Sequence, residues 1–137
     1  MKRVLLLGLT LLTAPAFAAE GEVDYRQNVY KAIGGHMSAM ADIVQQKVSH
    51  GSHMALHADA MADLAVMAKT LFPAGSEGGD ALPGVWANPD DFAARLGRFE
   101  EAAAALKTAT ASGEGVLPAF QAVAQSCKGC HDEYRKK

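Results

Sequence analysis

The sequence is poor in cysteine and in aromatic residues. Its 137 residues include 2 cysteines, and aromatic side chains make up 7% of the chain. No segment shows the alternation of β-branched and polar residues that a half-buried strand would show. Alanine is abundant instead, which favours helices that pack through small side chains. We therefore expect an all-α protein, and the length is that of one domain.

Clustered positive charge is also missing. The chain carries 13 Lys and Arg against 15 Asp and Glu, a formal net charge of -2 at pH 7. Its cations gather only at the end, in Arg135, Lys136 and Lys137. Because nucleic-acid-binding domains usually present a basic face, this distribution argues against nucleic acid as a partner.

Long apolar runs are absent except for one near the N-terminus. The run VLLLGLTLLTAPAF follows two basic residues and is closed by an Ala-Phe-Ala cleavage pattern that ends at Ala18. These features predict a signal peptide over 1–18 and a mature domain over 19–137, with no membrane insertion after cleavage. The alternative is an uncleaved anchor. It is disfavoured because the run is short for a bilayer and acidic residues follow it.

Four stretches repeat apolar residues every three or four positions, the periodicity of an amphipathic helix. They span about 24–48, 52–71, 88–111 and 116–134. The first pair and the last pair are joined by short connections, whereas a longer link rich in glycine and proline joins the pairs. This order predicts an antiparallel up-down-up-down four-helix bundle. We expect the long link to pack on its own Phe72, Val85 and Trp86.

Both cysteines lie in one motif of the fourth expected helix, CKGCH, which runs from Cys127 to His131. Residues three and four apart share a helix face, so both thiols and the imidazole should point into the same region. Gly34 and Gly35, in the first expected helix, should let another group approach the backbone closely.

Three kinds of site could use these residues. A thioredoxin-like dithiol would need a helix N-terminus and a βαβ context. A zinc site would need four ligands, and the remaining candidates are His50, His53 and His57. The third is covalent attachment of haem, for which C-x-x-C-H is the recognised signature. Export, a single motif and a helical bundle favour this third interpretation, with Cys127 and Cys130 as thioether anchors and His131 as the axial iron ligand.

One motif predicts one covalent haem c, which would fill a core that small side chains leave hollow. Together with other segments, the motif makes the chain resemble the cytochrome c′ family. The resemblance covers essentially the whole of 19–137 and is carried by YRQ (25–27), LFPAGSEGGD (71–80), PGVW (83–86) and SCKGCHDEYRKK (126–137). It implies a periplasmic four-helix bundle, commonly a homodimer.

The resemblance also implies roles for individual residues. Arg26 and Gln27 would hold the haem propionates, and Asp80 would contribute from the long link. Arg135 would lie beside the axial histidine. Many relatives carry a cation shortly before the proline of the link, where this chain has Leu82.

The residue four positions after Arg26 decides the sixth iron ligand in this family, and in this chain it is Tyr30. A tyrosine there implies a five-coordinate, high-spin haem that binds NO or CO and passes single electrons to redox partner proteins. The alternative is a low-spin, six-coordinate carrier with a methionine ligand. An enzyme is the weaker interpretation, because Tyr30 alone stands where a distal acid or base would act; we expect no catalytic residue.

Two further features concern the first two expected helices. Family members pair through these helices, and small or flexible apolar residues lie beyond the apolar stripe: Ala32, Ala39, Ala55, Ala65 and Met67. They predict a two-fold dimer.

The segment HGSHMALH could be a surface metal clip, although a solvated helix start that titrates near neutral pH is favoured. His36 is a lone histidine that water or packing should satisfy.

Overall fold

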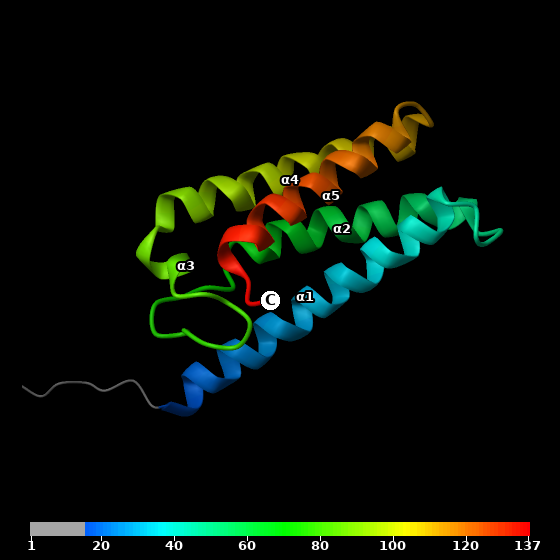
Figure 1. Cartoon of the computed structure of the whole chain (residues 1–137). Coiled ribbons are helices and arrows are strands. Elements are labelled where there is room, and N and C mark those ends of the chain that lie inside the picture. The colour runs from blue at the N-terminus through cyan, green and yellow to red at the C-terminus, as the bar shows by residue number, and fades with distance from the viewer. Residues whose placement is uncertain (1–15) are drawn as a thin grey trace, which may run out of the picture.

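A computed structural model describes residues 16–137 (Figure 1). Most of the expected signal peptide lies outside the described residues, so the peptide over 1–18 stays a prediction. Within the described part the chain forms helices and no β-strand. None of these helices combines the length and apolarity that crossing a membrane requires.

The first half of the fold is a helical hairpin. It consists of α1 (Ala16–Val44), a short 3-10 turn η1 (Gly51–His53) and α2 (Met54–Ala68). The helix α1 begins before the expected Asp24, because the preceding segment is rich in alanine and glutamate, which favour helix. It ends four residues earlier than expected, and Gln46 then takes a left-handed conformation with φ 56° that turns the chain toward α2.

The second half is another hairpin, made of α4 (Pro89–Ser112) and α5 (Val116–Tyr134). Local signals set the bounds of α4: a proline and two aspartates occupy its first turn, and Gly113 ends it in a left-handed conformation with φ 77°. The short helix α3 (Gly84–Ala87), inside the long link, was not anticipated from the sequence.

The four long helices form the expected up-down-up-down bundle (Figure 1). In it, α2 packs against both α1 and α4, and α4 packs against α5. Figure 1 shows both short turns at one end of the bundle, with the long link and the C-terminus at the other. The two ends of the bundle are therefore built differently.

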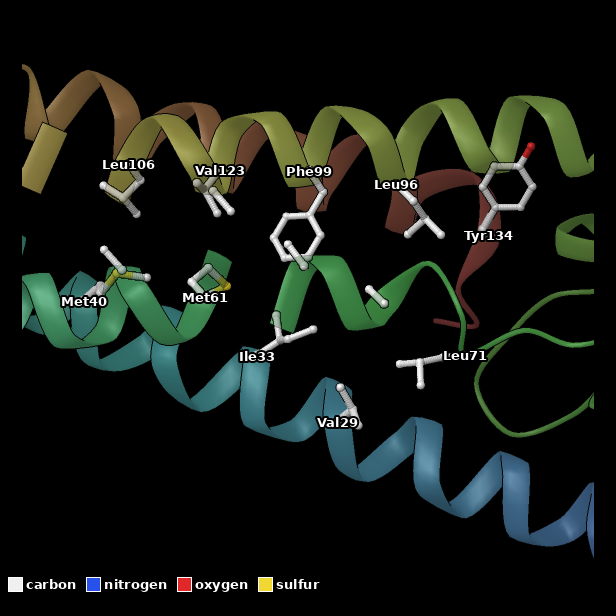
Figure 2. Packing of buried hydrophobic residues seen from close by; sticks show 14 of the residues in the cluster. Val29, Ile33, Met40, Met61, Leu71, Leu96, Phe99, Leu106, Val123 and Tyr134 are labelled. Carbon is white, nitrogen blue, oxygen red and sulfur yellow. The ribbon is translucent and has the colours of Figure 1, made fainter. Parts of the chain in front are cut away.

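The end with the short turns is closely packed. Figure 2 shows Met40, Met61, Leu106 and Val123 gathered between the helices, and all four are fully buried. The apolar stripe expected for the third helix is confirmed, since every member of it is buried: Phe92, Leu96, Phe99, Ala103 and Leu106.

On α2 the buried face is made largely of alanine. Ala58, Ala65 and Ala68 are fully buried, whereas Leu56 and Val66 are exposed. Small side chains allow α2 to approach both of its neighbours, which explains why alanines occupy the centre of the bundle. Assigning Ala65 to an outward pairing surface was therefore wrong.

The long link packs as expected on its own aromatic residues. The ring of Phe72 lies edge-on to that of Trp86, with centroids 6.1 Å apart, and Val85 is buried. The last residue of α5 and the tail after it pair with the link: the Leu82 amide donates to the Tyr134 carbonyl (2.9 Å) and the Lys136 amide to the Asp80 carbonyl (2.8 Å). The C-terminal tail thus fixes the link over one end of the bundle.

Candidate functional site

A cavity of about 460 Å³ opens at the end of the bundle that carries the long link. This volume lies within the range of roughly 300–1,000 Å³ that is usual for small-molecule pockets. Helices α1, α4 and α5 and the link supply its walls, which are largely apolar and aromatic. Every site residue expected from the sequence lines it: Arg26, Gln27, Tyr30, Asp80, Cys127, Cys130, His131 and Arg135.

The two thiols of the motif lie half-buried on the α5 wall. Cys127 and Cys130 are free, not joined in a disulfide. Burial raises the pKa of both thiols, that of Cys130 to about 11. They also stand near the C-terminus of α5, where the helix dipole does not favour a thiolate. The arrangement lacks what a reactive dithiol needs, a lowered pKa at a helix N-terminus.

The imidazole of the motif shares the same wall. Burial, and after it the charge of Arg135, lowers the pKa of His131, which favours the neutral ring that can bind a metal ion. Within residues 16–137, no group of three or more His, Cys, Asp or Glu side chains is arranged to hold a metal ion. The four-ligand zinc interpretation therefore has no support from the described residues.

A hydrogen-bonded brace ties α4 to the motif. Arg95 donates from Nε to the Asp91 carboxylate (2.7 Å) and from Nη1 to the Gly129 carbonyl. The Tyr134 hydroxyl donates to the same carboxylate (2.7 Å), and these hydrogen bonds lower the pKa of Asp91. Sequence analysis missed Arg95. The only feature of the sequence that could have indicated its role is its position four residues after Asp91, the spacing of an ion pair on a helix.

Arg26 is buried at the edge of the cavity, 3% exposed. Its guanidinium donates to the Leu71 carbonyl (3.2 Å), the Ser76 hydroxyl (3.1 Å) and carbonyl (2.9 Å), and the Gly78 carbonyl (3.2 Å). Burial lowers its pKa, but an arginine stays charged at neutral pH. Four hydrogen bonds thus hold the link against α1, and contact of Arg26 with a propionate stays a prediction.

Gln27 also lies against the link. Gly79 has φ 57°, which favours glycine, and a Cβ there would lie 2.7 Å from the Gln27 Nε2 atom, so any other residue would displace the Gln27 side chain. Asp80 is exposed at the cavity rim. Sequence analysis did not identify Lys31, which lines the cavity one helical turn after Gln27. With Arg95 and Arg135 it provides cations that an anionic ligand would meet.

Among the α1 residues that line the cavity, Tyr30, Gly34 and Met37 follow one another at helical spacing along one side of the helix. Tyr30 packs edge-on against Phe72 (centroids 5.9 Å apart), and burial raises the pKa of its phenol, which is protonated at neutral pH. A Cβ at Gly34 would meet nothing within 4 Å, so the wall is open there. Of the methionines in the described residues, Met37 alone lines the cavity.

Comparison with known proteins gives a consistent result. A family model described as Cytochrome C' matches residues 21–135. The chain is 34% identical over 122 residues to cytochrome c' of Pararhodospirillum photometricum, which covers 85% of this chain and 98% of the relative. It is 36% identical over 131 residues to cytochrome c-556 of Agrobacterium fabrum, covering 92% of this chain and 88% of the relative.

The fold is similar to that of a solved structure, the nitric oxide complex of a point variant of cytochrome c prime from Alcaligenes xylosoxidans. The TM-score is 0.81 at 30% identity, and the match covers 87% of this chain and 97% of that chain.

Replacing Arg26 should loosen the link. Arg26→Lys keeps the positive charge but loses the planar fork that reaches several acceptors at once. We expect backbone amides within 71–79 to exchange hydrogen about tenfold faster or more, because buried hydrogen bonds to a charged group are lost. Hydrogen-exchange mass spectrometry of the holoprotein measures this. Lys31→Gln, which removes a cavity-lining cation from the same helix, is the control; an equal change in both variants would contradict the assignment.

Proposed function

The chain belongs to the cytochrome c′ family, and from that premise we propose that it is a periplasmic c-type cytochrome whose iron keeps one axial position open for NO or CO. Its cofactor is haem c, and the single CKGCH motif provides for one haem. When bound, the haem supplies a redox-active iron that can also take a diatomic ligand.

The observation that carries the proposal is the convergence of two thiols, an imidazole and apolar walls on one cavity. Cys127 and Cys130 would hold the haem through thioether bonds, and His131 would bind the iron. Aromatic and aliphatic side chains of α1, α4 and the link would cover the macrocycle. Cations at the rim would meet its carboxylates: Arg26, Lys31, Arg95 and Arg135.

The brace and the link keep these groups in place. Through Arg95, α4 is tied to the backbone carbonyl inside the motif, which limits how far α5 can turn. Arg26 and the C-terminal tail hold the link over the cavity, so that water has less access to the site. Arg135, whose charge acts with burial to lower the pKa of His131, would favour the neutral imidazole that can bind the iron.

Tyr30 would control the remaining axial position. Its protonated phenol is a poor ligand, and burial makes ionisation costly. The ring, packed against Phe72, would leave room for a diatomic molecule and exclude larger ones. Because the raised pKa keeps its phenol protonated and reluctant to give up the proton near neutral pH, Tyr30 is a poor general acid or base. We therefore propose ligand binding and single-electron transfer to redox proteins rather than enzymatic turnover.

A low-spin electron carrier is the second candidate function, and Met37 is the observation that favours it. Met37 brings a thioether to the same cavity. It stands seven residues after Tyr30, roughly 10 Å further along the axis of α1. A ligand at that distance from the position of Tyr30 would require the haem to sit elsewhere along the helix, so the open-site proposal is preferred.

Covalent attachment is tested first. The pigment of the purified protein should stay with the polypeptide through acid-acetone extraction and denaturing electrophoresis, because thioether bonds survive both treatments. Replacing Cys127 and Cys130 together by alanine should release it and leave little folded protein. Ser126→Ala, at a neighbouring cavity-lining position, serves as the control and should keep its pigment. Release of the haem from the unaltered protein would contradict the proposal of covalent attachment.

The distal position is tested by ligand kinetics. Tyr30→Ala should speed CO association to the ferrous protein by about tenfold, equal to about 1.4 kcal/mol of relieved crowding. Tyr30→Met should convert the iron to a six-coordinate, low-spin state. Flash photolysis and absorption spectra report both changes. The Met37→Leu substitution should leave the absorption spectrum unchanged. If the unaltered protein instead showed a low-spin spectrum, and Met37→Leu abolished it, the electron-carrier function would be favoured.

Dimer formation is also part of the proposal, since family members pair through α1 and α2. Two exposed apolar residues of α2, Leu56 (67% exposed) and Met67 (38%), lie three turns apart on one face, whereas Ala65 is fully buried. Light scattering of the holoprotein at micromolar concentration should give twice the chain mass. The Leu56→Glu substitution should lower the measured mass to that of one chain. The control substitution Leu117→Glu, at an exposed position of α5, should leave the mass unchanged. A single-chain mass for the unaltered protein would refute pairing.

A further inference from the structure

Two histidines from different helices meet outside the cavity. The Nδ1 atoms of His36 on α1 and His57 on α2 lie 2.9 Å apart. Their rings are edge-on, with centroids 5.2 Å apart and planes at 67°. Both side chains are half-buried, and neither lines the cavity that we assign to the haem. The expectation that His36 would be an isolated residue was therefore wrong.

The two nitrogens are spaced as neighbouring ligands of one metal ion. An imidazole nitrogen binds a divalent metal at about 2.0–2.1 Å. Two such nitrogens 2.9 Å apart would subtend an angle of about 90° at the ion. A tetrahedral angle would need a separation of roughly 3.3 Å. The spacing thus suits two adjacent positions of a square-planar or octahedral ion better than the tetrahedral geometry of zinc.

From this geometry we propose that His36 and His57 form a binding site for divalent copper, which bridges α1 and α2. Imidazole is a good ligand for Cu²⁺, and Cu²⁺ binds nitrogen sites more tightly than Ni²⁺ or Zn²⁺ does. As the ion binds, the proton shared by the two Nδ1 atoms moves through water to the Nε2 atom of the ring that carried it, so both rings stay neutral. Each ring turns so that its Nδ1 lone pair points at the ion.

The surroundings of the pair are consistent with this role. Burial, and then the nearby His36 and His53, lowers the pKa of His57, so its ring is more easily kept in the neutral, ligating form. Within residues 16–137 no third metal-binding side chain joins the pair, and water fills the remaining positions of the ion. Because α1 and α2 pack together, the two ligands are already held in place.

A second pair of histidines, His50 and His53, lies close by in the sequence and serves as a comparison. His50 and His53 stack face to face, with centroids 5.0 Å apart and planes at 7°, and no hydrogen bond joins their rings. This pair lies in and just before the exposed turn η1, within one stretch of chain. The surface clip considered from the sequence consisted of His50, His53 and His57, but in the structure the ring of His57 pairs with His36 of another helix.

The test uses the haem-loaded protein and Cu²⁺ alone as the probe. Calorimetric titration should show one copper ion bound per chain. In the electron paramagnetic resonance spectrum of the bound copper, the nitrogen hyperfine splitting should correspond to two imidazole ligands. His36→Gln and His57→Gln should each weaken binding by about a hundredfold or more, because losing a ligand costs at least as much as losing a residue that only supports one. His50→Gln is the matched control and should bind as the unaltered protein does.

Three results would overturn the proposal. The first is that the unaltered protein binds no copper. The second is that His36→Gln and His57→Gln bind copper as tightly as the unaltered protein does. The third is that only His50→Gln loses binding, which would assign copper to the His50 and His53 pair. Should either glutamine variant fail to fold, the hyperfine count of the unaltered protein decides the question, since fewer than two nitrogens excludes the bridge. A melting temperature that rises with Cu²⁺ in the unaltered protein and not in the variants would further support it.

Discussion

Side chains fill the interior at one end of this bundle and leave a cavity of about 460 Å³ at the other. An apolar space of that size forfeits dispersion contacts along its whole lining, so the fold depends on the group that occupies it. Haem c is therefore a structural component as well as a reactive one. The packed end, around Met61 and Leu106, holds the four helices together. The open end, between α1 and α5, determines what the protein can bind.

Features that depend on neighbours in the sequence could be predicted well. The bounds of α4 and α5 and the buried stripe from Phe92 to Leu106 follow from periodicity and from end signals such as Pro89 and Gly113. The site motif is likewise local, because its residues lie within two helical turns. Their gathering around one cavity with Arg26 and Tyr30 came from the family resemblance, since no local pattern relates α1 to α5.

Features that depend on distant contacts could not be read from the sequence. Arg26 binds acceptors 45 to 52 residues away, and Arg95 binds a carbonyl 34 residues away. Nothing in the periodicity of α1 says that an arginine would be buried with four carbonyl and hydroxyl partners. The histidine pair between α1 and α2 is similar, because its spacing depends on how the two helices are rotated. Ala65 was misplaced for the same reason.

The position of the attachment residues on α5 affects how much protein a cell can accumulate. Helices α1, α2 and α4 are synthesised before α5, so their apolar cavity walls exist before any side chain that can hold the cofactor. A chain that lacks haem keeps those walls exposed, and exposed apolar surface promotes aggregation and degradation. We therefore expect the yield of folded protein to depend on the supply of haem.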